Sequence, residues 1–114
     1  MRIQQLKRES WEGYLSSLAG QPLLVDVRLS GTRDDDAGQL WRALRAIRYD
    51  AAEDVLVLAV GGPDADRPSL RYFVPAPRLM TLAHEHATTS LIVADRTGAE
   101  TVITLASAAA ALAV

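Results

Sequence analysis

The chain has 114 residues and a mass of 12.3 kDa, which predicts one domain spanning residues 1–114 with a single hydrophobic core. Hydrophobic residues make up 49% and charged residues 23%, a balance that excludes an intrinsically disordered chain. The absence of cysteine excludes disulfides, iron–sulfur clusters and cysteine nucleophiles, and the net charge of −2 argues against non-specific binding of nucleic acid.

The first residues and the overall composition indicate where the protein works. Residues 1–9 are polar and lack the apolar core of a secretion signal, and no uninterrupted apolar run reaches about 18 residues. We therefore expect a cytoplasmic protein that neither enters a membrane nor carries a cofactor. One lysine against eleven arginines, together with nineteen alanines, is typical of a GC-rich bacterial genome.

A short helix is predicted near the N-terminus, over about residues 10–20. Ser10 is a favourable N-cap, and Gly20 is a favourable end. Between them, four apolar residues recur with the spacing of one helix face: Trp11, Tyr14, Leu15 and Leu18. This apolar stripe predicts a helix that covers one face of a sheet.

Residues 23–60 predict a strand followed by a hairpin. Alternate apolar residues indicate a half-buried strand over 23–29, and the aspartate-rich segment 31–38 indicates a loop. Segment 39–49 fits both a helix and a strand; we favour a strand, bulged near Arg45. The reason is that the short polar segment 50–54 leads directly into the valine-rich run 55–60, a strand buried on both faces.

The second half of the chain predicts further strands. A strand over 70–74 is interrupted by Pro75 and Pro77, which lack a backbone donor, and it resumes over 78–82. Segments 90–95 and 99–105 form a hairpin, because the three-residue link between them contains Gly98. The alanine-rich segment 106–114 is either a helical turn or a frayed end.

Together these elements predict an α+β fold. A short N-terminal helix packs on a mostly antiparallel, curved meander of five to six strands, or on a small half-barrel, over about residues 23–105.

The order of these features resembles the bacterial family of uncharacterised proteins DUF5335, over roughly residues 8–105. The likeness rests on a tryptophan-led helix, a valine-rich strand, an isoleucine-x-tyrosine-aspartate turn, a strand opened by aspartate and a final hairpin. These features begin here at Trp11, Leu24, Ile47, Asp54 and Leu91. Tyr72 stands where the family often has a histidine. The resemblance implies a compact α+β domain and no known activity.

His84 and His86 form the only histidine cluster in the sequence. On a strand, the two imidazoles would share one face and could bind a metal ion, with Asp50, Asp54 or Tyr72 completing the site. The alternative is a solvated loop tip, which we favour because two ligands do not make a metal site.

The carboxylates also have two interpretations. Asp50 and Asp54 flank one turn, which fits a general acid–base pair but fits a turn better, because aspartate bonds backbone amides there. The contiguous carboxylates of 34–36 do not have the alternate spacing of a calcium loop.

A candidate interaction surface is predicted around the third strand. It comprises Trp41, Arg42, Arg45 and Tyr72. On a helix, Arg42, Arg45 and Arg48 would form one stripe, whereas on a regular strand Arg45 would face away from the other two.

No catalytic motif stands out, so the sequence favours a non-catalytic protein-interaction or regulatory domain that acts as a homodimer through a sheet edge or the apolar tail. Two alternatives remain open. One is a metal- or small-ligand-binding enzyme using His84 and His86, and the other is RNA binding by an Sm-like barrel.

Overall fold

The computed structural model describes residues 2–18, 21–29, 41–61 and 70–107. The described elements are eight strands, one α-helix and one 3-10 turn that directly precedes the helix. In chain order they are β1 (Arg2–Leu6), η1 (Arg8–Ser10), α1 (Trp11–Leu18), β2 (Leu23–Leu29), β3 (Arg42–Asp50), β4 (Val55–Gly61), β5 (Leu70–Pro75), β6 (Pro77–Glu85), β7 (Thr88–Asp95) and β8 (Glu100–Ser107).

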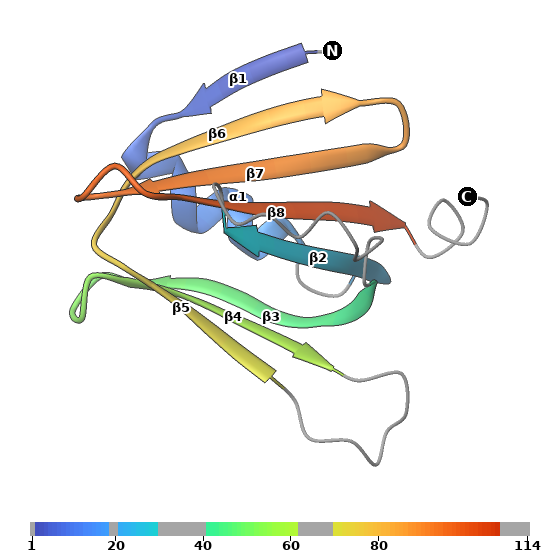
Figure 1. Ribbon diagram of the computed structural model, residues 1–114, viewed down its shortest axis with the longest axis horizontal. Helices are drawn as coiled ribbons and strands as arrows, with labels where there is room; N and C mark the ends of the chain where they lie inside the picture. Colours follow the sequence, from blue (N-terminus) through green and yellow to red (C-terminus); the bar gives the residue numbers. More distant parts are fainter. Residues whose placement is uncertain (1, 19–20, 30–40, 62–69, 108–114) are drawn as a thin grey trace.

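All eight strands belong to one antiparallel sheet in the order β1-β6-β7-β8-β2-β3-β4-β5 (Figure 1). The α+β class with a helix on an antiparallel sheet is therefore confirmed, but the expected count of five to six strands is wrong. The arrangement is also more than a meander, because β1 pairs with β6 and β2 pairs with β8 across long stretches of chain.

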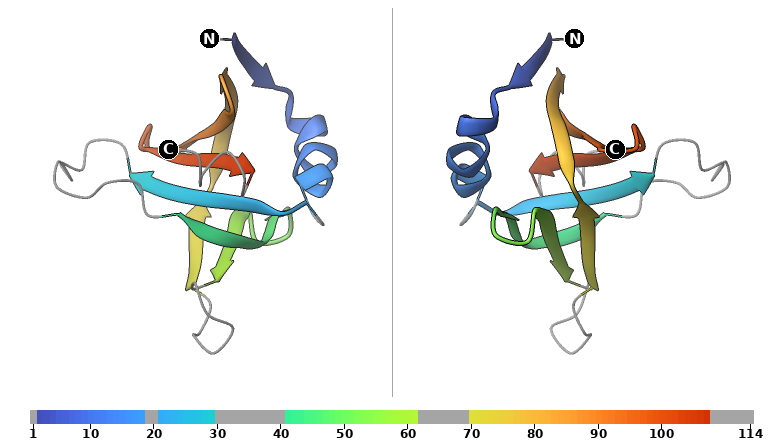
Figure 2. Two further views of the ribbon diagram at one scale, coloured as in Figure 1. Left: turned by 90° about the vertical axis from the view of Figure 1, so that its right-hand side faces the viewer. Right: turned by 90° about the vertical axis from the view of Figure 1, so that its left-hand side faces the viewer.

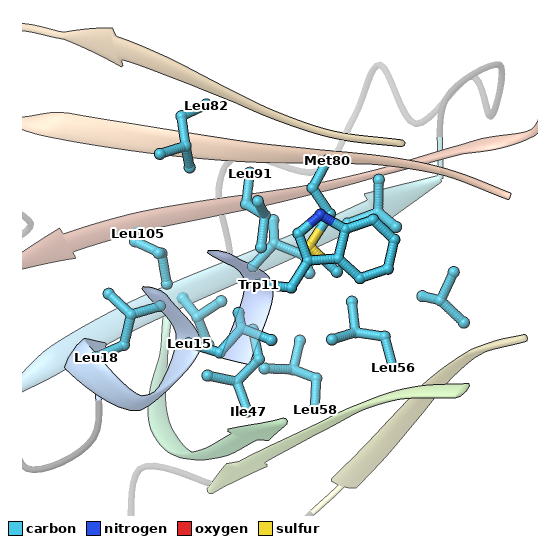
Figure 3. Close-up of a cluster of buried hydrophobic side chains, with 14 of the residues drawn as sticks. Trp11, Leu15, Leu18, Ile47, Leu56, Leu58, Met80, Leu82, Leu91 and Leu105 are labelled. Atoms are coloured by element: carbon cyan, nitrogen blue, oxygen red, sulfur yellow. The ribbon is translucent and has the colours of Figure 1, made fainter. Parts of the chain in front are cut away.

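The sheet is strongly curved, and α1 lies against its inner face (Figure 2). Trp11 is 1% exposed and Leu15 is 2% exposed. Figure 3 shows these side chains pointing toward leucine, isoleucine and methionine side chains of several strands, among them Ile47, Leu56 and Met80. The predicted apolar stripe of the helix thus supplies one side of the hydrophobic core, while a 3-10 turn that ends at Ser10 leads into the helix.

Two local features of the strands were anticipated by the sequence. Segment 39–49 contributes a strand, and the pairing of β3 with β4 shifts register between Leu44 and Ala46, which makes Arg45 the bulged residue. The β7–β8 hairpin turns through Gly98 at φ 91°. Asp95 stabilises that turn, because its Oδ1 accepts hydrogen bonds from the backbone amides of Thr97 and Ala99.

The two prolines mark a corner between strands. β5 ends at Pro75 and β6 begins at Pro77, with Ala76 between them at φ 49°. The Ala76 amide donates to the Asp54 carbonyl at 2.8 Å, and the Ala76 carbonyl accepts from the Arg96 amide at 3.0 Å. These two bonds hold the corner between the β3–β4 and β7–β8 turns.

Within the described ranges, no helix has both the length and the apolar character needed to cross a bilayer. The predicted loop 31–38 lies outside the described residues, as does the tail beyond Ser107.

Candidate functional site

A pocket of about 370 Å³ opens at the edge of the inner face. Three segments line it: the end of β2, the middle of β5 and the start of β8. The described lining residues are Val27, Arg28, Leu29, Tyr72, Phe73, Val74 and Thr101.

The pocket exists because β2 extends beyond its neighbour β3. β2 pairs with β3 only at Leu24 and Val25, whereas its pairing with β8 continues to Leu29 opposite Thr101. The last residues of β2 therefore have a strand on one side only among the described elements. Figure 2 shows this end of β2 extending away from α1, so the pocket lies at the end of the inner face that is distant from the helix.

Two residues with exposed apolar side chains border the pocket. Phe73 is 59% exposed and Leu29 is 58% exposed, although Val74 and Thr101 beside them are buried. Phe73 lies on β5, an edge strand that pairs with β4 and with no other described strand. An apolar pocket bordered by an unpaired strand edge is a typical site for binding another polypeptide.

Three polar residues are among the described lining residues of the pocket. They are Thr101, Tyr72 and Arg28, whose Nε donates to Asp26 Oδ2 at 2.9 Å. The described lining residues include no carboxylate and no histidine, so they provide no general acid–base pair.

On the helix side of the sheet, a polar network joins three segments: η1, the β3–β4 hairpin and the start of β6. Arg8 Nη2 donates to the Tyr49 hydroxyl at 2.6 Å, and that hydroxyl donates to Asp54 Oδ1 at 2.7 Å. Arg78 Nη1 donates to Asp54 Oδ2 at 3.1 Å. The Arg8 guanidinium also lies 5.1 Å from the centre of the Trp11 ring, a cation–π distance.

The network shifts two pKa values in opposite directions. The hydrogen bonds from Tyr49 and Arg78 hold the pKa of Asp54 below its usual value. The bond to Asp54 raises the pKa of the Tyr49 phenol, because that bond stabilises the protonated hydroxyl. Both groups are bonded to each other in the folded protein, so the network ties the helix to the β3–β4 turn and the start of β6.

The predicted interaction residues do not form one surface. Tyr72 lines the pocket, and Trp41 is half-buried immediately before β3. Arg42 pairs opposite the buried Val25 and so belongs to the inner face. Arg45 lies on the outer face, because its guanidinium covers the position where a side chain on Gly61 would point.

The histidine pair is also divided. His84 lies in β6 with its Nδ1 3.1 Å from Thr89 Oγ1, while His86 lies in the β6–β7 turn at φ 50°. The turn between β6 and β7 has only two residues, 86–87, so of the two histidines favoured as a loop tip only His86 lies in a turn.

The carboxylates offered as further metal ligands lie elsewhere. Asp54 bonds Arg78 at the start of β6, whereas His84 lies six residues further along that strand, about 20 Å away. Asp50 accepts hydrogen bonds from the amides of Ala52 and Glu53, as expected of a turn residue. Over residues 2–18, 21–29, 41–61 and 70–107, no three His, Cys, Asp or Glu side chains are grouped to hold a metal ion.

Sequence reasoning missed most of the pocket. Val27 and Leu29 were recognised only as one face of a strand, and Phe73 received no role. The available signal was the apolar run from Tyr72 to Val74, ending at a proline that stops the strand.

The chain matches no family model, no curated protein and no solved structure. The resemblance to DUF5335 stays a prediction.

Proposed function

We propose that the protein is a non-catalytic interaction domain that forms a homodimer through the edge of β5. The observation that carries the proposal is the exposure of Phe73, 59%, on an edge strand beside an apolar pocket. Large exposed apolar groups that adjoin a pocket mark contact sites on soluble domains.

The backbone of β5 supports this choice. An edge strand presents unpaired amide and carbonyl groups, and natural proteins protect such edges with charge, proline or cover. β1, at the other edge, has two glutamines and Arg2 among its five residues. β5 has three consecutive apolar or aromatic residues, Tyr72, Phe73 and Val74, before Pro75 ends it. β5 also carries Arg71, so charge is present at both edges, and what distinguishes β5 is the apolar pocket beside it.

A second copy of the chain is the partner that fits this edge with no further assumption. Two β5 strands related by a two-fold axis run antiparallel, which is the pairing present throughout this sheet. The partner strand then lies along the rim of the pocket, covers Leu29 and packs beside Phe73, whose side chain stands on the outer face of the sheet. Both copies bury the same surface, so the assembly closes as a dimer.

Light scattering after size exclusion, over a range of protein concentrations, tests the proposal. We expect the wild-type chain to be a dimer and Phe73→Asp to be a monomer, because the substitution replaces an apolar contact beside the partner strand with a carboxylate that loses part of its hydration there. Ile3→Asp is the matched control: Ile3 is 63% exposed on the opposite edge strand, so this variant should remain dimeric. A wild-type chain that is monomeric at millimolar concentration, or equal dissociation of both variants, would overturn the proposal.

A further inference from the structure

The outer face of β3, β4 and β5 gathers positive charge around one exposed aromatic ring. On β5, Tyr72 and Val74 face the core, so Arg71 and Phe73 point outward. On β3, Ile47 faces the core. Arg48 therefore also points outward, opposite Val57, which in turn is opposite Phe73.

The bulge in β3 adds a third cation to this face. In a regular strand, Arg45 would face away from Arg48. Because Arg45 is an extra residue in the pairing with β4, its side chain lies instead on the outer face against Gly61. We call Arg45, Arg48, Arg71 and Phe73 the arginine–phenylalanine face.

The positive charge of the arginine–phenylalanine face is only partly neutralised. Arg48 Nη1 lies 3.8 Å from Asp50 Oδ2, and the Arg48 side chain is 66% exposed. Neither Arg45 nor Arg71 forms an ion pair with another residue of the described ranges. Between the arginines lie Val57 and Ala59, which are uncharged and half-buried. The surface therefore presents cations around an open apolar centre.

The spacing on this face suits an extended polyanion whose units carry flat rings. Arg71 and Phe73 are two residues apart on one strand, about 7 Å, and Arg48 and Phe73 are two strands apart, about 10 Å. A base can stack on the exposed Phe73 ring while neighbouring phosphates contact the arginines. An acidic peptide would use the charges but has no need of an aromatic platform.

We infer that the arginine–phenylalanine face binds single-stranded nucleic acid. The net charge of −2 supplies no long-range attraction, so the interaction depends on the local field of the three arginines on this face and should be strongest at low salt. The inference shares Phe73 with the proposed dimer: the partner strand packs beside this residue along the β5 edge, whereas the base stacks on the ring from the outer face of the sheet.

Fluorescence anisotropy with a labelled oligo(U) strand, measured against salt concentration, tests the inference. With three phosphate contacts, the logarithm of the association constant should fall by about two for each tenfold rise in salt. The double variant R45Q/R48Q should weaken binding at least tenfold at low salt and reduce that slope to about 0.7, the value for one contact. The control is the double variant R2Q/R96Q, which removes two exposed arginines that lie away from this face. It should bind the strand with the affinity of the wild type.

Phe73→Leu separates stacking from charge. It should weaken binding at least fivefold with an unchanged salt slope, because it removes the ring and leaves the arginines. The leucine stays apolar, so the dimer should persist, and failure of one proposal remains distinguishable from failure of the other. The inference is overturned if the oligo(U) strand shows no salt-dependent binding, or if both arginine double variants lose affinity equally. It is also overturned if polyglutamate binds more tightly than oligo(U) and Phe73→Leu leaves the affinity for polyglutamate unchanged.

Discussion

The inner face of the sheet is covered at the end where α1 packs and is left exposed at the end where the pocket opens. On one side, α1 covers the sheet, and Trp11 is 1% exposed beneath the Arg8–Tyr49–Asp54–Arg78 network. On the other side, the pocket between β2 and β5 leaves Leu29 58% exposed, although it occupies a core-facing position opposite Thr101. The same alternation of residues thus produces a sealed core at one side and an open apolar surface at the other.

This difference separates stability from recognition. Burial of a large apolar side chain contributes to folding only where water is excluded, so the helix side should contribute most of the stability of the domain. An apolar group that remains exposed in the folded chain contributes its burial free energy to binding, when a partner covers it. The pocket side can therefore change its contacts without unfolding the chain.

The largest expected effect on stability belongs to Trp11. Trp11→Ala should lower the free energy of unfolding by about 3–5 kcal/mol, because it leaves a cavity at the centre of the core and removes the edge-to-face contact with Tyr49. Urea denaturation at one protein concentration measures the change. Glu12→Ala, an exposed substitution in the same helix, should change stability by less than about 0.5 kcal/mol. Equal effects of the two substitutions would show that α1 does not seal the core.

How far the sequence predicts the fold depends on whether the signal is local. Alternation identified β2, and β-branched residues with a short connection identified the β3–β4 hairpin. β1 was missed because Arg2–Leu6 has no apolar alternation; its register is set by β6, some 80 residues away. The strand count was wrong for that reason, and also because β5 and β6 are two strands joined at a proline corner.

The candidate site was harder to predict because it depends on relative strand lengths and on one bulge. Periodicity assigned Leu29 to the apolar face of its strand but could not show that β2 extends beyond the end of its pairing with β3. The bulge at Arg45 was anticipated, yet its consequence for the direction of that side chain was not. Both features arise from the pairing between strands, which a single sequence does not specify.

A smaller effect is expected from the network that holds the helix side. The pKa of Asp54 is lower in the folded chain than its unfolded value near 3.9, so ionised Asp54 stabilises the fold above that pH. This contribution is lost as pH falls through the folded pKa. Asp54→Asn should therefore lower Tm at neutral pH, by less than Trp11→Ala does, and the difference from wild type should shrink on acidification.

Thermal unfolding followed by circular dichroism from pH 7 to pH 3 measures this dependence. Glu53→Gln removes one carboxylate from the same turn and is the matched control, since its side chain is exposed and contributes no hydrogen bond to the network. A difference in Tm between wild type and Asp54→Asn that stays constant down to pH 3 would contradict the assigned role of Asp54.

We expect the smallest effect on stability from Leu29→Ala. Comparison with Leu15→Ala tests the difference between the two sides directly, because the same residue type is changed on each. Leu15 and Leu29 both occupy core-facing positions, but Leu15 is 2% exposed whereas Leu29 is 58% exposed. Leu15→Ala should cost about 2–5 kcal/mol of unfolding free energy, whereas Leu29→Ala should cost less than about 0.5 kcal/mol under conditions that keep the chain monomeric. The Leu29 variant should instead weaken the dimer, visible as dissociation at higher protein concentration. If Leu29→Ala destabilised the monomer as much as Leu15→Ala, the pocket side would be part of the sealed core, and its exposed apolar groups would offer no surface for a partner.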